Sequence, residues 1–173
     1  YKELVSGGVW INRDVVGPEN GDEQVLMLLK KEDGINTSYD QQLADQNELK
    51  LYLEKLSTFS RFLRFANDFR KVERDQIIYE IVRIDNLDYI SLRLEDACEF
   101  ILSKDYTDNW RSEMHERFCF WSFNDWKEQL MKAGFEIGPG SGAYTNPWIE
   151  ENRIAGKVEL FKKVDGYLKK LSA

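Results

Sequence analysis

The chain contains little of the chemistry that marks metal, disulfide or membrane proteins. Its 173 residues include 2 cysteines, 3 prolines and a single histidine. Cys98 and Cys119 lie in apolar surroundings and no CxxC motif exists, so we expect buried thiols in a reducing compartment and no zinc site. No apolar run approaches the roughly 20 residues of a membrane span, and no signal peptide is present. We therefore expect a cytoplasmic protein that does not enter a membrane.

An excess of positive charge is also missing. The 24 basic residues are outnumbered by 31 acidic ones, which gives a formal net charge of −7. Proteins that bind a phosphate backbone usually present a basic surface, so we expect no nucleic-acid partner. Apolar residues make up 42% and aromatic residues 13% of the chain, a globular composition with enough length for one core.

The first half of the chain contains two apolar patterns of helical spacing. Asp22 and Glu23 are expected to open a short helix that ends before Asp33-Gly34. Apolar residues then recur at three- and four-residue steps from 49 to 69, which predicts one long amphipathic helix. Basic residues are interleaved with aromatic ones on this helix, a pattern that suits either a solvated face or contact with an anionic ligand.

Between residues 77 and 94 the pattern changes to β-branched and aromatic residues. IIYEIVRI and YISLRL are separated by four polar or turn-forming residues, so we expect a hairpin with a four-residue turn, residues 85–88. A helical pattern returns over residues 95–102. Ser122, with Asp125 three positions later, predicts a variant of the capping box at the start of a helix that ends at Gly134.

Short strands are expected near both ends of the chain. The Gly7-Gly8 pair follows what reads as the end of a helix, and Val9-Trp10-Ile11 then reads as a buried strand. After Gly134, residues 135–137 are expected to start a strand, GPGSG to form a loop, and residues 157–161 to form a final strand.

Taken together, these terminal motifs resemble the C-terminal half of a class I (Rossmann-like) S-adenosylmethionine-dependent methyltransferase. They are L-x-x-GG-x-x-x-x-x-D, here Leu4, Gly7, Gly8 and Asp14, and the order helix, AGF, strand, loop, strand from residue 126 to 161. The resemblance covers roughly 20 residues at the start and roughly 50 at the end. It implies an α/β fold in which residues 1–20 and 122–173 form part of the methyltransferase sheet, and residues 21–121 form a mixed helical and hairpin lid for substrate recognition.

The resemblance also implies S-adenosylmethionine as the cofactor, but of a longer protein. The family's glycine-rich loop after the first strand and the acid ending the second strand are both missing here, so we expect no cofactor binding by this chain alone. The partner would be a small-molecule methyl acceptor. An unpaired strand edge at residues 8–14 would favour self-association. The alternative is a non-enzymatic protein-interaction module of α/β fold.

Methyl transfer requires alignment of a nucleophile with the activated methyl group and, in some reactions, removal of a proton. The resemblance places Asp14 at the active edge of the sheet, beside Arg13; a turn or cap residue is the alternative. His115 could act as a base, since its ordinary pKa suits neutral pH, but a lone histidine on a polar helix is more often structural.

The remaining candidates are substrate contacts, each weighed against a structural role. Helical spacing from residue 107 onward would place Trp110, Met114 and Phe118 on one face and would allow Glu113 to pair with Arg117. Aromatic groups can line a pocket or fill a core, and loop residues can recognise a substrate or anchor a turn. The candidates are Arg13, Tyr106, Trp110, Glu113, Trp121, Tyr144, Asn146 and Trp148.

Overall fold

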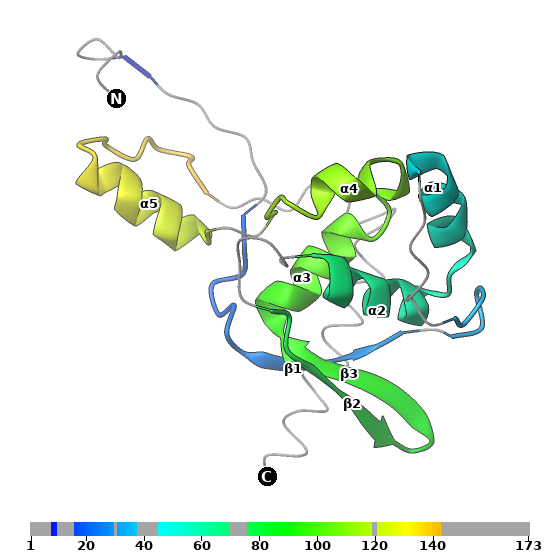
Figure 1. Cartoon of the computed structure of the whole chain (residues 1–173). Coiled ribbons are helices and arrows are strands. Elements are labelled where there is room, and N and C mark those ends of the chain that lie inside the picture. Colours follow the sequence, from blue (N-terminus) through cyan, green and yellow to red (C-terminus); the bar gives the residue numbers. More distant parts are fainter. Residues whose placement is uncertain are drawn as a thin grey trace.

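A computed structural model describes residues 8–9, 16–29, 31–37, 45–69, 76–118 and 121–142. Over these residues the chain is a mixed α/β structure in which helices pack on a three-stranded antiparallel sheet of order β1-β3-β2 (Figure 1). The expected α/β class is confirmed at this level. The described sheet belongs to the middle of the chain and contains no parallel pair of strands.

The first strand corrects the helix expected after Asp22. Residues Gln24–Leu28 form β1, which pairs antiparallel with β3. After Gln24 the strand is a continuous apolar run, and Val25, Leu26 and Met27 are all buried. A run of this kind fits a strand that is covered on both faces as well as it fits a helix, and periodicity alone cannot separate the two.

The hairpin is confirmed, with a tighter turn than expected. Strand β2 spans Tyr79–Ile84 and β3 spans Leu87–Arg93, in a register that pairs Ile84 with Leu87. Only Asp85 and Asn86 lie between the strands, and both have positive φ, 49° and 63°. Positive φ at both central residues defines a type I′ turn, in which Asp and Asn are favoured because they tolerate the left-handed conformation.

The long helix expected over residues 49–69 is two helices. Helix α1 spans Gln46–Lys55 and α2 spans Thr58–Asp68. Leu56 adopts an extended conformation, and the side chain of Ser57 caps α2 by accepting the backbone N–H of Ser60. The backbone of Ile35 bonds on both sides of this break, donating to Lys55 O and accepting from Ser57 N. The tertiary contact therefore interrupts a helical periodicity that continues across it.

The core lies between the sheet and the helices. Helix α3, Leu94–Ser103, follows β3 directly and confirms the helix expected there. The phenyl rings of Phe62 and Phe100 meet edge to face at 5.2 Å between centroids, and Phe69 meets the Trp110 ring in the same way at 5.0 Å. The segment after α3 holds only a 3-10 turn, η1 Thr107–Asn109, and one helical turn, α4 Trp110–Glu113.

Helix α5, Phe123–Lys132, begins and ends as expected. Ser122 and Asp125 form both halves of a capping box, and Gly134 has a φ of 88° just past the helix. The amide of Phe135 donates to Leu130 O, which completes the left-handed helix end. No residue of α5 is buried, and the helix stands apart from α1 to α4 (Figure 1).

The expected terminal strands are not formed by the described residues. Residues 135–137 follow α5 without strand pairing. Val9 was expected to be buried in a strand, yet its side chain is 80% exposed and it lies in no strand. A strand needs a partner for its hydrogen bonds, and the segments expected to pair here, residues 10–15 and 157–161, lie outside the described residues.

Candidate functional site

Two segments far apart in the sequence meet beside α3, and together we call them the neck. The ingoing strand of the neck is residues 16–23, and its outgoing strand is residues 117, 118, 121 and 122; the word strand here means a length of chain, because the two form one isolated bridge and no β-strand of the sheet. The amide of Gly17 donates to Trp121 O at 2.8 Å, within a parallel bridge between Gly17 and Ser122. Next to this bridge, the amide of Asn124 donates to a carboxylate oxygen of Glu19 at 3.2 Å, across 105 positions of sequence. The chain therefore returns at residue 122 to the place it left at residue 17.

The start of α3 holds the ingoing strand of the neck through its backbone. The amide of Leu94 donates to Glu23 O at 2.7 Å, and that of Glu95 donates to Gly21 O at 2.9 Å. The first N–H groups of a helix have no partner inside the helix. No side chain caps the N-terminus of α3, and two of its first N–H groups donate instead to backbone carbonyls of the neck.

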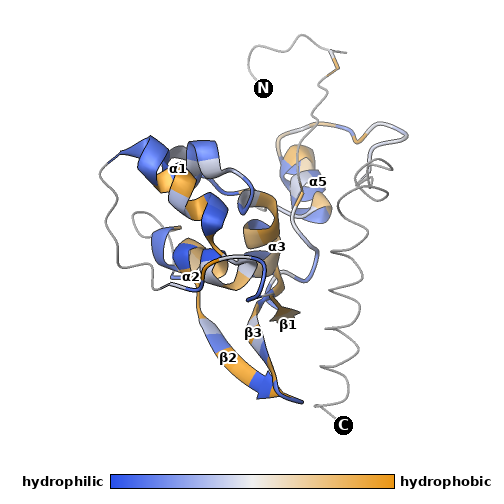
Figure 2. Ribbon diagram, turned by 90° about the vertical axis from the view of Figure 1, so that its right-hand side faces the viewer, coloured by the Kyte–Doolittle hydropathy of each residue, from blue (hydrophilic) through white to orange (hydrophobic). Residues whose placement is uncertain are grey.

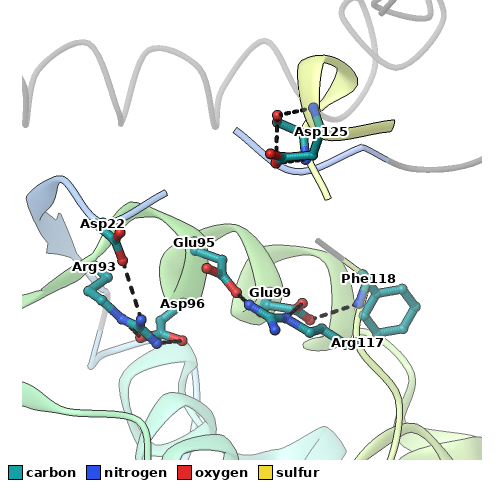
Figure 3. Close-up of polar contacts among 9 residues, drawn as sticks. Asp22, Arg93, Glu95, Asp96, Glu99, Arg117, Phe118 and Asp125 are labelled. Carbon is teal, nitrogen blue, oxygen red and sulfur yellow. Dashed lines mark hydrogen bonds and ion pairs between the residues drawn. The ribbon is translucent and has the colours of Figure 1, made fainter. Parts of the chain in front are cut away.

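The middle of α3 holds the outgoing strand of the neck through side chains. Glu95 and Glu99 lie one turn apart, and the Arg117 guanidinium pairs with both, with its Nε 4.0 Å from Glu99 Oε1 (Figure 3). The other oxygen of Glu99 accepts the backbone N–H of Phe118 at 3.1 Å. The expected pairing of Arg117 with Glu113 gives way to these contacts, because the helix after residue 107 stops at Glu113 and cannot place the two side chains on one face.

A second arginine is fixed at the end of β3, next to α3. The Nε of Arg93 donates to the buried carboxylate of Asp96 at 3.0 Å, and its Nη1 lies 3.5 Å from the exposed Asp22 (Figure 3). Donation of this hydrogen bond to Asp96 raises the pKa of Arg93. These contacts beside the neck thus place two arginines among four carboxylates, Asp22, Glu95, Asp96 and Glu99, which leaves a net negative charge.

Among the expected substrate contacts, Tyr106 and Trp121 are at or beside the neck. The ring of Tyr106 stacks on that of Phe118 with centroids 5.6 Å apart and planes 5° apart, and its side chain is 45% exposed. Trp121 meets Trp126 of α5 edge to face at 4.8 Å. Both aromatic pairs involve residues of the outgoing strand, so they present partly exposed rings where the lid expected from the resemblance would meet the rest of the protein.

Trp110 lies in the hydrophobic core. Its side chain is fully buried, and its Nε1–H donates to Asp68 Oδ2 at 3.0 Å. A side chain without exposed surface cannot contact a substrate in this conformation, so the packing alternative describes Trp110. The helical spacing of Trp110 therefore marks a side of α4 that packs against the end of α2, where its ring meets that of Phe69.

Glu113 and His115 lie just before the outgoing strand. His115 is exposed and its amide donates to Ser112 O at the end of α4. Burial raises the pKa of Glu113, and the neighbouring Glu116 adds to the rise. Glu113 and His115 precede Arg117, the first residue of the outgoing strand of the neck, by four and two positions. The remaining expected site residues lie outside the described residues: Arg13, Asp14, Tyr144, Asn146 and Trp148.

The basic residues of α2 are committed to contacts within the protein. Arg61 donates from Nη2 to Leu53 O at 2.7 Å and from Nη1 to Lys104 O at 3.1 Å, and burial lowers its pKa. Arg64 pairs with Asp68. These two guanidinium groups are therefore unavailable for an anionic ligand. For Arg61 and Arg64, the alternation of basic and aromatic residues reflects contacts within the protein.

A hollow on the sheet was not anticipated from the sequence. It has a volume of about 700 Å³ and lies at the open ends of the three strands. The available signal was the spacing of Ser91 and Arg93, because polar residues two positions apart lie on the same face of a strand. Its lining consists of Gln24, Gln76, Ile78, Tyr79, Glu80, Ser91 and Arg93.

The described residues hold no group of three or more histidine, cysteine, aspartate or glutamate side chains that could bind a metal ion. Nor does any described helix have the length and apolar character needed to span a membrane. Comparison with protein-family models, curated proteins and solved structures gives no match to this chain. Proposals about function therefore depend on the resemblance and on the geometry of the neck.

Proposed function

We propose that this chain supplies the C-terminal sheet strands and the substrate-binding lid of a class I S-adenosylmethionine-dependent methyltransferase that acts on a small molecule. The observation that carries the proposal is the neck. An insertion must leave a fold and return to the same place, and the pairing of Gly17 with Ser122 brings its two ends together. The expected boundaries, residues 20 and 122, lie near this point, which supports the proposal.

The packing of the intervening residues supports the same proposal. Every buried apolar residue of the main core lies between Val25 and Trp110. A lid inserted into another domain needs a core of its own, because it has to keep its shape while it moves relative to that domain. The partly exposed aromatic residues Tyr106, beside the neck, and Trp121, within it, are the ones that we propose to contact the methyl acceptor.

The role of this chain in the reaction would be positional. S-adenosylmethionine supplies an activated methyl group when it is bound to the cofactor half, and the lid excludes water and orients the acceptor. His115 is exposed near the neck and could accept a proton from the acceptor.

The experiment compares the complete polypeptide encoded by the gene with a variant in which residues 22–116 are replaced by a short Gly-Ser linker. The 2.8 Å contact between Gly17 and Trp121 shows that a short linker can span the gap. We expect the complete protein to bind S-adenosylmethionine and to methylate a small-molecule acceptor, and the shortened variant to bind the cofactor without methylating. Methylation by the shortened variant would reject the lid, and a complete protein that does not bind the cofactor would reject the methyltransferase. The 173-residue chain alone should give no saturable heat with S-adenosylmethionine at micromolar concentration.

An interaction module is the second candidate, and one observation favours it. Three large apolar side chains are exposed in or beside the hairpin: Ile81 by 53% on the edge strand β2, Ile78 by 76% just before that strand, and Leu87 by 47% at the start of β3. Exposed apolar side chains on an edge strand are a typical docking surface for another protein. Replacing Ile78 and Ile81 by glutamate should abolish partner binding if this module explains the protein, and should leave methylation intact if it does not.

A further inference from the structure

The two strands of the neck are attached to α3 in different ways. The ingoing strand is held by backbone hydrogen bonds at Leu94 and Glu95, which no side-chain substitution removes. The outgoing strand is held by side chains: Arg117 with Glu95 and Glu99, and the Phe118 amide with Glu99 (Figure 3). The outgoing attachment is therefore the one that a change of side chain can release.

The burial of this attachment matters for what it does. The Glu99 side chain is only 2% exposed, that of Glu95 14% and that of Arg117 25%. Removing charged groups from water costs free energy that largely offsets their attraction, so such pairs contribute little net stability. Buried ion pairs do favour one conformation of the chain over others, because a buried carboxylate is costly in any conformation that leaves it without hydrogen-bond donors.

The arrangement fixed here is that of α5 relative to the lid. Helix α5 starts one residue after the outgoing strand, at Phe123, and none of its residues is buried. Its apolar residues are visible in Figure 2, and Figure 1 shows that it stands apart from α1 to α4. With so little packing of its own, its direction depends on the segment that leads into it.

We infer that Arg117 is a positioning residue, which holds the lid in one orientation relative to α5 by clamping the outgoing strand onto Glu95 and Glu99. The inference rests on the proposed function in one respect: residues from α5 onward are taken to belong to the methyltransferase sheet. The clamp then sets where the lid places the acceptor. Opening the clamp leaves the contacts of Gly17 with Trp121 and of Glu19 with Asn124 to hold α5, so its orientation becomes less restricted.

The test measures orientation directly by the distance distribution between two spin labels. One label is attached at Asn47→Cys on α1 and the other at Gln129→Cys on α5, both exposed sites, in a background where Cys98 and Cys119 are serine. We expect one narrow distribution in the parent chain and a clearly broader one in Arg117→Met. An unchanged distribution in Arg117→Met would overturn the inference.

A matched control separates orientation from general loosening. Arg64 forms a similarly buried ion pair with Asp68 on α2, away from the neck, so Arg64→Met should leave the distribution narrow. If both methionine variants broaden it equally, the clamp has no specific role. Glu99→Gln keeps an acceptor for the Phe118 amide and loses the charge, so it should broaden the distribution less than Arg117→Met.

Hydrogen exchange provides the second measurement, and it remains informative if Arg117→Met is less stable. Release of the clamp should speed exchange of the Phe118 amide about tenfold by local opening while the amides of α2 keep their rates. Uniformly faster exchange would mean that Arg117 supports the whole fold and would reject a positioning role. Neither measurement needs cofactor or acceptor, so both can succeed even if methylation is not found. In the complete enzyme, Arg117→Met should raise the KM for the acceptor more than it lowers kcat.

Discussion

Trp110 offers the sharpest test of the core, because the sequence suggested substrate contact and the structure places it inside. Its ring packs edge to face on Phe69 at 5.0 Å, and its Nε1–H donates to Asp68 at 3.0 Å. Asp68 also accepts hydrogen bonds from Arg64 and from the side-chain amide of Asn67. Removing the indole therefore deletes a large apolar group and one of several donors to a largely buried carboxylate.

The expected cost can be divided by comparing two variants. Trp110→Ala should lower the free energy of unfolding by about 3–5 kcal/mol, the usual range for removing a buried large aromatic side chain. Trp110→Phe keeps most of the ring and loses the hydrogen bond to a charged acceptor, so it should cost about 1.5–3 kcal/mol. A domain of this size has a total stability of about 5–15 kcal/mol, and the alanine variant would therefore lose a large share of it.

The assay is urea unfolding followed by far-ultraviolet circular dichroism, with the stabilities taken from linear extrapolation. Asp68→Asn combined with Trp110→Phe in a double-mutant cycle isolates the bond between the two side chains. A loss below about 1 kcal/mol for Trp110→Ala would place the indole at the surface and refute the packing described here. The substrate-contact alternative makes the opposite prediction, since Trp110→Phe would then change acceptor binding with little change in stability.

Three further changes test other parts of the structure by the same unfolding assay. Gly34→Ala should destabilise by about 1–3 kcal/mol, because an added Cβ would lie 2.6 Å from the carbonyl carbon of Leu56; an unaffected midpoint would mean that this close approach is absent. Burial raises the pKa of Glu113 above its unfolded value, so the carboxyl group contributes stability at acidic pH and loses this contribution as the pH rises through the folded pKa. The Glu113→Gln variant should therefore be more stable than the parent at neutral pH and lose this advantage below about pH 4. A stability difference that does not change with pH would contradict the raised pKa. Ser122→Ala should cost about 1 kcal/mol, since the serine oxygen accepts the amide of Asp125, whereas Ser122→Thr should retain most of the cap.

The sequence by itself determined the features whose causes lie within a few residues. The capping box of Ser122 with Asp125 and the helix end at Gly134 are local hydrogen bonds and local φ preferences. The hairpin is of the same kind, because β-branched residues flank a turn of Asp85 and Asn86 that accept positive φ. In each, the interaction that decides the structure joins neighbours in the chain.

Tertiary structure decided the features that depend on distant partners. The apolar run of β1 became a strand because β3 offered its edge, and the helix over residues 49–69 broke at Leu56 because Ile35 bonds to the backbone there. The candidate site follows the same rule. Arg117 could pair with Glu113 if one helix contained both, but α4 ends at Glu113. The partners of Arg117 are instead two carboxylates of α3, Glu95 and Glu99, which lie far from it along the chain. The neck itself could not be derived from local patterns, because its contacts, such as those of Gly17 with Trp121 and of Glu19 with Asn124, join residues about a hundred positions apart.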